Sequence, residues 1–256
     1  MQSLSVVIIC KNEAGIIGKT LQSLEGLTDD IIVYDNGSTD DTVAIAKKFP
    51  VTVYESCWTG FGRTKNMANE KARYDWILSL DADEAIDEEL KKSLLALSLT
   101  DEKTVYEIKF KNFFGTQWLR FGEWGNDKHI RLYDRRQVNW DEEPVHEKLV
   151  LPAGTGISRL KGNILHYTAI DLEKYRIKLS KYAVLNAEKY YEQGKKTGAF
   201  RKYAAGFFSF LQNYIFRAGF LDGKGGYRCA MMTSRYTYDK YKNLEKMSKQ
   251  IKDNNE

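Results

Sequence analysis

The chain has 256 residues, of which 43% are hydrophobic and 29% are charged, so it holds enough apolar material for one sizeable core. This composition excludes a disordered or low-complexity protein. The 39 Lys and Arg and the 35 Asp and Glu leave a formal charge of only +4, which does not identify a nucleic-acid-binding protein by itself.

The first hundred residues alternate between short apolar runs and segments with helical spacing. The expected strands are residues 4–10, 31–34, 51–54 and 76–80. Alternation of this kind is typical of a parallel sheet with crossover helices. The last of these strands is followed by Asp81-Ala82-Asp83-Glu84, at the carboxyl edge where such sheets bind their ligands.

The pattern changes after residue 104. Residues 106–110 and 129–133 alternate between apolar and polar side chains, which predicts antiparallel or mixed strands added to the sheet. From residue 171 the sequence is helical in pattern and rich in Tyr, Lys and Arg. We therefore expect an α/β domain over residues 1–170 and a helical extension over residues 171–256.

Asp81 and Asp83 are the strongest candidates for chemistry. In a tight turn, two carboxylates separated by one residue can approach one Mg²⁺ or Mn²⁺, which also takes oxygen from substrate phosphates. An isolated Asp-x-Asp is more often a surface turn with a helix cap. Here, however, Asp35 and the pair Asn12-Glu13 end two other strands at the same edge of the sheet, which favours a ligand site.

Each of three further residues at this edge has one functional and one structural interpretation. Asp35 can accept hydrogen bonds from a base or ribose, or it can support the turn that follows it. Asn12 can belong to the donor site or cap the next helix. Lys65 can neutralise a phosphate, or it can be a solvated helix lysine.

Three segments resemble the family 2 glycosyltransferases, in the right order along the chain. They are Ser5-Val6-Val7-Ile8-Ile9-Cys10-Lys11-Asn12-Glu13, Val33-Tyr34-Asp35-Asn36-Gly37-Ser38-Thr39-Asp40-Asp41-Thr42 and Asp81-Ala82-Asp83. The resemblance implies a GT-A fold, a Rossmann-like mixed sheet that binds a nucleotide-sugar donor and a divalent metal, and inversion at the anomeric carbon. It also implies that Asp35 contacts the nucleoside, that Asp83 binds the metal, and that Asp81 lies by the ribose and diphosphate.

The second half is similar to the bacterial transferases that add sugars to the lipopolysaccharide inner core. The segments that carry this similarity are residues 131–133, 144–147, 165–167 and 219–223, so the resemblance covers about residues 5–240. It implies UDP-glucose or another UDP-hexose as donor and a lipid-linked saccharide as acceptor. Residues 1–100 would then be the nucleotide-binding half and residues 101–170 the acceptor half of the catalytic domain.

An inverting sugar transfer needs a base that takes the proton of the acceptor hydroxyl, and a carboxylate is the usual choice. Residues 141–147 supply four candidates. We favour Glu147, because Val145-His146-Glu147 falls where related enzymes carry their base motif, with Glu143 as the alternative. A solvated acidic loop is the competing interpretation.

His166 follows an apolar run and precedes the helical region. This position resembles that of the C-terminal histidine of GT-A enzymes that joins the metal or the diphosphate. A neutral imidazole can complete such a site. The alternative is a histidine packed at the end of a strand.

The stretch 204–221 carries apolar residues on one broad helical face, interrupted by polar side chains. The face comprises Phe207, Phe208, Phe210, Leu211, Tyr214, Ile215 and Ala218. The interruptions and Arg217 argue against a span of the bilayer, and flanking Lys and Arg suit the anionic surface of the inner membrane. A core helix or a dimer contact is equally compatible, whereas no RNA-binding signature accompanies the stretch and no nucleic-acid partner is expected.

Three cysteines stand at positions 10, 57 and 229 without a CxxC or metal-ligand spacing. This odd, scattered set argues against a disulfide framework and favours a cytoplasmic location. If the 204–221 face meets a membrane, that location is peripheral to the inner membrane. The apolar run at residues 4–10 has no basic segment before it and no cleavage site after it, so it predicts a strand and not a signal peptide.

Two other functions compete with a transferase. A nucleotidyltransferase would have a Gly-rich, basic loop after the first strand, and the sequence there, Lys11-Asn12-Glu13-Ala14-Gly15, matches poorly. A non-catalytic module that binds nucleotide-sugar or a membrane surface on the same fold is the stronger alternative. The acidic pair, together with Glu147 and His166, argues against it.

Overall fold

The computed structural model describes residues 3–141, 147–195 and 197–254. Contacts divide them into two compact units: the first runs to Phe110 and continues from Lys128 to His166, and the second comprises Lys111–Asp127 and the chain from Tyr167 onward. Among the described residues, none of the helices is both long enough and apolar enough to cross a membrane.

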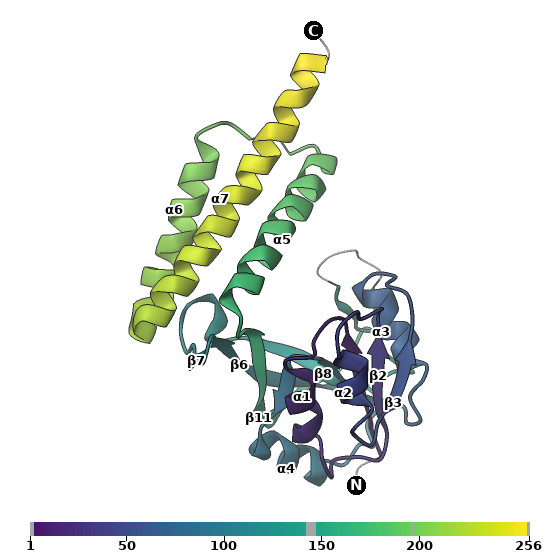
Figure 1. The fold of residues 1–256 in the computed structure, drawn as a ribbon. Coiled ribbons are helices and arrows are strands. Elements are labelled where there is room, and N and C mark those ends of the chain that lie inside the picture. The colour runs from purple at the N-terminus through teal and green to yellow at the C-terminus, as the bar shows by residue number, and fades with distance from the viewer. Residues whose placement is uncertain (1–2, 142–146, 196, 255–256) are drawn as a thin grey trace. The chain divides into compact units, whose positions relative to one another are not determined.

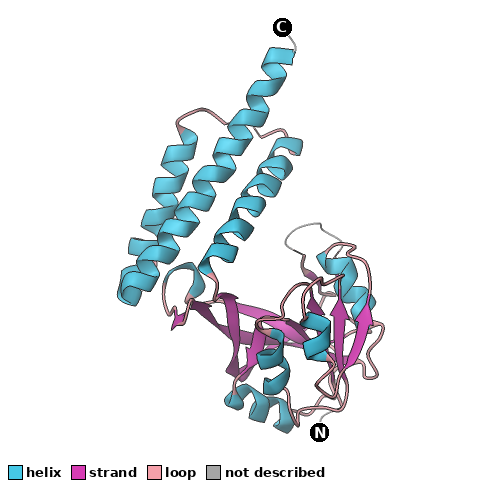
Figure 2. Ribbon diagram, viewed as in Figure 1, coloured by secondary structure: helices cyan, strands magenta, loops and turns pink. Residues whose placement is uncertain are grey.

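The first unit is built on a mixed sheet (Figure 2). Its parallel part comprises β1 (Ser5–Cys10), β2 (Ile31–Asp35), β3 (Thr52–Glu55) and β4 (Trp76–Asp81), in the order β3-β2-β1-β4. These strands lie where the apolar runs predict them, within one residue at each end. All six residues of β1 are buried, because helices cover both faces of a parallel sheet.

The two faces of β1 contribute to separate cores. Val6 and Ile8 pack with residues of α1 (Ile17–Ser23), α2 (Thr42–Ala46) and α4 (Glu88–Ala96) on one face. Val7 and Ile9 pack with α3 (Phe61–Asn69) on the other. This alternation follows from the period of two along a strand. It places α3, the helix that carries Lys65, on the Val7 and Ile9 face of the sheet.

The rest of the sheet continues past β4 in the order β8-β6-β11-β5. The added strands are β8 (Lys128–Asp134), β6 (Thr104–Phe114), β11 (Gly156–Ala169) and β5 (Glu84–Ile86), and the short β7 (Gln117–Trp118) pairs with β6. β8 is antiparallel to both β4 and β6, as the alternating pattern predicts. A separate two-stranded ribbon joins β9 (Asn139–Trp140) to β10 (Leu149–Val150).

The second unit is mainly helical (Figure 1). It contains η1 (Gly122–Trp124), α5 (Leu172–Glu192), α6 (Arg201–Leu211), the π-helix η2 (Gln212–Phe216), η3 (Gly219–Asp222) and α7 (Gly223–Asn254). α7 packs against both α5 and α6. The helical C-terminal extension predicted from the sequence is therefore present.

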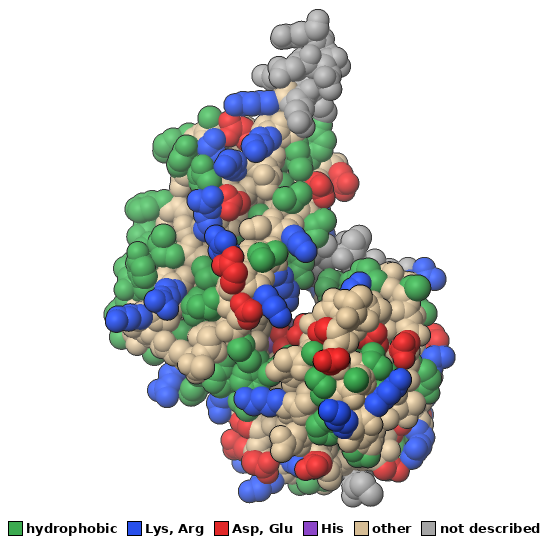
Figure 3. All heavy atoms as spheres, in the orientation of Figure 1, with side chains coloured by type: hydrophobic (Ala, Val, Ile, Leu, Met, Phe, Trp, Pro, Cys, Tyr) green, Lys and Arg blue, Asp and Glu red, His purple; other side chains and the backbone are tan. Residues whose placement is uncertain are grey.

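The apolar stretch 204–221 is not one continuous helix, because α6 ends at Leu211 and gives way to η2 and η3. Six of its large apolar side chains are exposed, and we call them the aromatic surface: Phe207, Phe208, Ile215, Phe216, Phe220 and Leu221. Figure 3 shows hydrophobic side chains gathered over α6, with Lys and Arg beside them. Packing in a core therefore does not explain these residues.

Candidate active site

The carboxyl ends of three neighbouring strands meet at one edge of the first unit. In the register of the sheet, Cys10 of β1 lies beside Asp35 of β2, and Ile9 lies beside Asp81 of β4. Because parallel strands end together, residues more than forty positions apart in the sequence gather at this edge. This is the convergence that the sequence predicts.

Asp35 and Asn12 hold the loops of this edge together. The buried Asp35 carboxylate accepts hydrogen bonds from the backbone N–H groups of Gly37, at 3.0 Å, and Ser38, at 2.9 Å. Asn12, whose φ is +57°, accepts one from the N–H of Thr39 at 2.8 Å, and the N–H of Glu13 donates to Thr42. Asp35 thus supports its turn, and its contact with a nucleoside stays a prediction.

Asn12 does not cap the following helix. α1 begins at Ile17, after an N-cap position, Ile16, that makes no side-chain cap.

Cys10 contributes to the same edge through its Sγ, 3.5 Å from Asp35 Oδ1. Burial and the Asp35 carboxylate raise the pKa of the Cys10 thiol far above its usual range, so the thiol stays protonated and can donate to Asp35.

Lys65 is a buried cation, not a solvated helix lysine, since its exposed fraction is only 3%. α3 packs on the sheet through Ala68, and the residue three positions earlier shares that helix face. Lys65 Nζ lies 2.9 Å from Glu147 Oε1 and 3.5 Å from Asp81 Oδ1. It also lies 4.3 Å from the centre of the Trp140 ring.

Arg131 comes from β8 and reaches the other side of Asp81, with 3.3 Å between its Nη2 and Asp81 Oδ2. It also pairs with Glu84, which is fully buried and accepts a hydrogen bond from the backbone N–H of Asp81 at 3.0 Å. Burial raises the pKa of Glu84, although Arg131 opposes this. Burial alone would lower the pKa of Arg131, but the carboxylates of Glu84 and Asp81 raise it, so the guanidinium is charged.

These side chains form one row of ion pairs in which negative and positive groups alternate. In order, it runs Glu84, Arg131, Asp81, Lys65 and Glu147. The sequence motifs assign no site role to Arg131, Glu84 or Trp140. The available signal was a charged residue within the apolar run Ile130-Arg131-Leu132-Tyr133, because an unpaired charge is rarely buried in such a strand.

Asp83 and His166 face each other at the same turn. His166 lies on β11 and is paired in register with Glu84 of β5, and its Nε2 is 3.5 Å from Asp83 Oδ2. Burial alone would lower the pKa of His166, but the carboxylate of Asp83 raises it, and the net pKa lies above the usual 6.5. Carboxylate oxygens beside an imidazole nitrogen fit a Mg²⁺ or Mn²⁺ site.

The metal-ligand set is incomplete as it stands. Within the described ranges, no cluster of three or more His, Cys, Asp or Glu side chains is arranged to hold a metal ion. A bound ion would therefore need oxygen from a substrate phosphate or from water, as is usual for Mg²⁺.

A cavity of about 480 Å³ opens beside this row of ion pairs. It is lined by Lys65, Asp81, His129, Ile130, Arg131, Trp140, Glu147, Lys148 and Leu149. Lys65, Asp81 and Glu147 therefore lie together, whereas Asn12, Glu13 and Asp35 belong to the loops after β1 and β2 and do not line this cavity. Glu143, the alternative base, lies outside the described residues.

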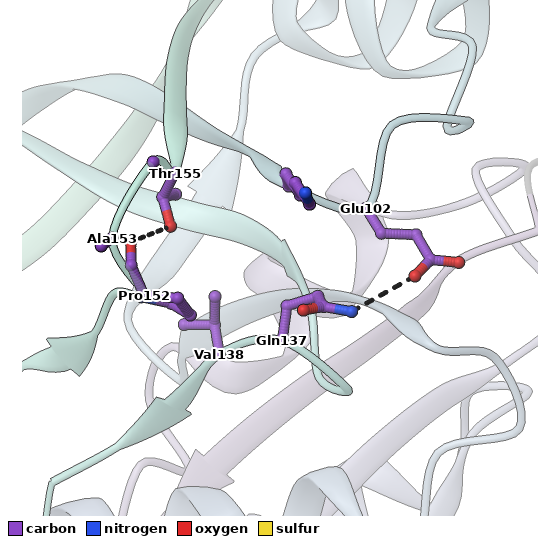
Figure 4. Close-up of a pocket in the computed structure, with 8 residues that line it drawn as sticks. Glu102, Gln137, Val138, Pro152, Ala153 and Thr155 are labelled. Carbon is purple, nitrogen blue, oxygen red and sulfur yellow. Dashed lines mark hydrogen bonds between the residues drawn. The ribbon is translucent and has the colours of Figure 1, made fainter.

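Figure 4 shows a much smaller cavity of about 50 Å³ elsewhere in the first unit. At its wall, Gln137 donates a hydrogen bond to Glu102, and Thr155 donates one to the carbonyl oxygen of Pro152. Its volume suits a water molecule and not a sugar nucleotide.

Comparison with known proteins agrees with the motifs. The sequence profile of glycosyl transferase family 2 matches residues 5–150. An uncharacterised glycosyltransferase of Rickettsia typhi is 32% identical over 238 residues, which cover 89% of this chain and 81% of that protein. The lipopolysaccharide core biosynthesis glycosyltransferase LpsC of Rhizobium meliloti is 27% identical over 252 residues, 93% of each chain.

Among solved structures, TarS of S. aureus in complex with UDP aligns with 97% of this chain and 92% of its own, at 18% identity and a TM-score of 0.48. The strand order, the matched profile and the relatives confirm the GT-A fold class predicted from the motifs. The chain belongs to glycosyl transferase family 2.

Proposed function

We propose that this glycosyltransferase moves a sugar, with inversion, from UDP-glucose or another UDP-hexose to a lipid-linked saccharide in lipopolysaccharide core biosynthesis. The main support for the proposal is the cavity at the end of β4. Two buried cations, Lys65 and Arg131, meet two carboxylates, Asp81 and Glu147, at its wall. The name of the relative LpsC supports the choice of acceptor.

Lys65 and Arg131 are the groups that would bind the donor diphosphate. Both are more than nine-tenths buried and both line the cavity, so little water screens their charges. The Arg131 Nε is buried without a hydrogen-bond partner among the described residues, which leaves a donor for an incoming phosphate oxygen. Asp35, Asn12 and Glu13 would receive the nucleoside at the neighbouring strand ends.

Asp83 and His166 would hold a Mg²⁺ or Mn²⁺ ion, with Asp81 beside them. Their donor atoms suit either ion, and His166 would have to lose its proton before it binds. When bound, the metal stabilises the negative charge of the departing nucleoside diphosphate.

Glu147 would take the proton of the acceptor hydroxyl as that oxygen attacks the anomeric carbon. Its ion pair with Lys65 at 2.9 Å fixes the carboxylate at the cavity wall. Lys65 thereby links the group that accepts the proton to the site proposed for the diphosphate.

We place the enzyme in the cytoplasm, at the surface of the inner membrane where a lipid-linked acceptor is presented. The exposed aromatic surface and the nearby Arg217, Lys224 and Arg228 support this location. Lys202, which the sequence places beside the same stretch, is engaged elsewhere, since its ammonium lies 2.6 Å from Glu245.

Replacing the proposed base separates binding from transfer. Glu147→Gln should keep UDP affinity within about threefold and lower the transfer rate at least about 100-fold, because general base catalysis is worth that much. Binding is measured by calorimetry and transfer by release of UDP in the presence of lipid-linked acceptor. The matched control is Glu70→Gln, an exposed residue just after α3.

If Glu147→Gln transfers sugar at the wild-type rate, the base assignment is wrong and Glu143 becomes the candidate. If the wild type binds UDP but transfers to no acceptor, the non-catalytic binding module replaces the proposed enzyme.

A further inference from the structure

The second unit contains a cationic cavity of its own. Its volume is about 430 Å³, and its lining residues are Arg120, Phe121, Gly122, Glu123, Gly125, Asn126 and Arg217. The lining includes two arginines and one glutamate, so its formal charge is positive. Every one of these residues belongs to the second unit.

Hydrogen bonds hold the two arginine-bearing segments together. The buried Asp222 accepts the backbone N–H groups of Arg120 and Phe121, each at 2.9 Å. The N–H of Gly122 donates to the carbonyl oxygen of Arg217, also at 2.9 Å. Arg120 and Arg217 are nearly a hundred residues apart in the sequence, and these bonds bring them to the same cavity.

The backbone next to Arg217 adopts conformations that are uncommon in proteins. η2 is a π-helix, and Ala218 has a φ of +55°, which a residue with a Cβ rarely adopts. A Cβ on Gly219 would come within 2.5 Å of the Asn213 carbonyl oxygen, so the turn requires glycine there. Such strain persists only where the surrounding structure enforces it, and it is frequent at binding sites.

The charges of this cavity are not balanced internally. Throughout the part of the chain that the structure describes, no carboxylate forms an ion pair with Arg120 or Arg217. Arg120 instead lies 4.6 Å from the centre of the Trp118 ring. Elsewhere in the same unit, Arg235 does have a partner, Asp239, at 2.8 Å. The two guanidiniums of the cavity are thus available to an external anion.

In the sequence, apolar side chains that face water border Arg217, a residue of the cavity lining. Phe216, which precedes Arg217, is 71% exposed, and Phe220 and Leu221 follow a few residues later. Exposed aromatic residues are favourable at the boundary between lipid headgroups and acyl chains, and arginine there binds phosphate. A site for free phosphate would need no such border.

We propose that Arg120 and Arg217 bind the phosphate of an anionic lipid headgroup while the aromatic surface enters the bilayer interface. This extends the proposed function, because a lipid-linked acceptor would be met at the same membrane. It concerns a site in the second unit, separate from the residues of the cavity beside Asp81, and it can be tested without donor or turnover.

The test is co-sedimentation of the whole chain with vesicles of phosphatidylcholine, alone or mixed with phosphatidic acid. The wild type should bind the mixed vesicles more tightly. Arg120→Gln with Arg217→Gln should weaken that binding roughly 30-fold, from about 1 kcal/mol for each cation at an anionic surface. The control, Lys178→Gln with Lys181→Gln, removes the same charge from exposed positions on α5 and should weaken binding by less than about threefold.

A second pair of substitutions tests the apolar part. Phe207→Ser with Phe216→Ser should abolish the fraction of vesicle binding that survives high salt, because burial of apolar area does not depend on ionic strength. Circular dichroism must show the wild-type helical spectrum for each variant. Phe210→Ser, at a half-buried position, would be unsuitable because it is expected to unfold the unit.

Four results would overturn the proposal. The first is equal binding by the wild type and the Arg120/Arg217 variant, and the second is an equal loss in the lysine control, which would mean diffuse attraction. The third is a wild type that sediments as a dimer and a Phe207/Phe216 variant that sediments as a monomer, with no binding of either protein to vesicles. Inorganic phosphate that displaces the protein fully from mixed vesicles, at concentrations where chloride of equal ionic strength does not, would assign the cavity to free phosphate instead. UDP binding, measured separately, is unaffected by any of these outcomes.

Discussion

Lys65 shows how a single residue links the parts of the candidate site. Its ammonium is almost fully buried and is balanced by the carboxylates of Asp81 and Glu147. A buried cation is tolerated only when such partners compensate for its lost hydration. Removing it therefore leaves two carboxylates that repel each other.

We predict that Lys65→Met destabilises the chain by about 2 kcal/mol and weakens UDP binding at least about tenfold. Urea unfolding and calorimetry measure the two effects. The control is Lys47→Met, whose exposed ion pair with Glu55 should contribute no more than about 0.5 kcal/mol. Equal stability of both variants would show that Lys65 is not electrostatically tied to the site.

Some of these residues could be expected from the sequence and others could not. Asp81 and Glu147 follow from motif positions, and Lys65 follows from the helix expected to approach the same edge of the sheet. In the structure the three are ion-pair neighbours, although their roles stay predictions. The contact of Arg131 with Asp81 depends on the register between β8 and β4, in which Leu132 lies beside Leu78. Such a pairing between distant strands leaves no local trace in the sequence.

At the scale of elements, β11 passes unusually close to α4 at Gly162. The residue has a φ of +93°, and a Cβ there would overlap the backbone of Leu90. We predict that Gly162→Ala lowers the free energy of unfolding by about 3 kcal/mol or more, through both backbone strain and steric overlap.

Gly154→Ala is the matched control for this prediction. Gly154 also has a positive φ, +84°, but open space surrounds the position of its Cβ. It should cost only about 1 kcal/mol, the strain of the left-handed conformation alone. Equal losses in the two variants, measured by urea unfolding, would refute the argument from close packing.

The pairing of α6 with α7 gives a pH dependence. Hydrogen bonds from Lys202 and Lys249 lower the pKa of Glu245 to about 2, from 4.5 in the unfolded chain. Because the unfolded state binds the proton more tightly, this contribution to stability is complete above about pH 5 and is lost as the pH falls toward 2. Thermal unfolding of wild type and Glu245→Gln should therefore differ at pH 7 and converge near pH 2. A constant difference across this range would show that the ion pair does not set the pH dependence.

Some of the helices and strands, like some of the site residues, could be predicted from the sequence, and others could not. Apolar runs predict β1 to β4 well, because strands buried on both faces need continuous hydrophobic sequence. The same hydrophobic criterion predicts one helical face over residues 204–221, and the structure breaks it at η2 and Ala218. That break depends on hydrogen bonds to residues 120–122, which lie far away in the sequence.

For the whole molecule, the sequence predicts the class of protein better than its substrates. Membership of glycosyl transferase family 2, the mixed sheet and the helical extension are confirmed. These properties rest on motifs and hydrophobic patterns that span most of the chain. The proposed donor and acceptor would be selected by a few cavity side chains, such as Trp140 and His129, whose position comes only from the fold.

The edge that holds Asp81 and Asp83 is proposed as a metal-dependent site for a uridine nucleotide. Calorimetric titration with UDP and with GDP, each with and without Mn²⁺, measures both the nucleotide preference and the metal dependence. We predict that UDP binds at least about tenfold more tightly with Mn²⁺, and that Asp83→Ala removes this gain while Asp101→Ala, at an exposed turn, retains it. Binding that is the same with and without Mn²⁺, or that survives unchanged in Asp83→Ala, would contradict the metal site, and failure to bind either nucleotide would contradict the proposed donor.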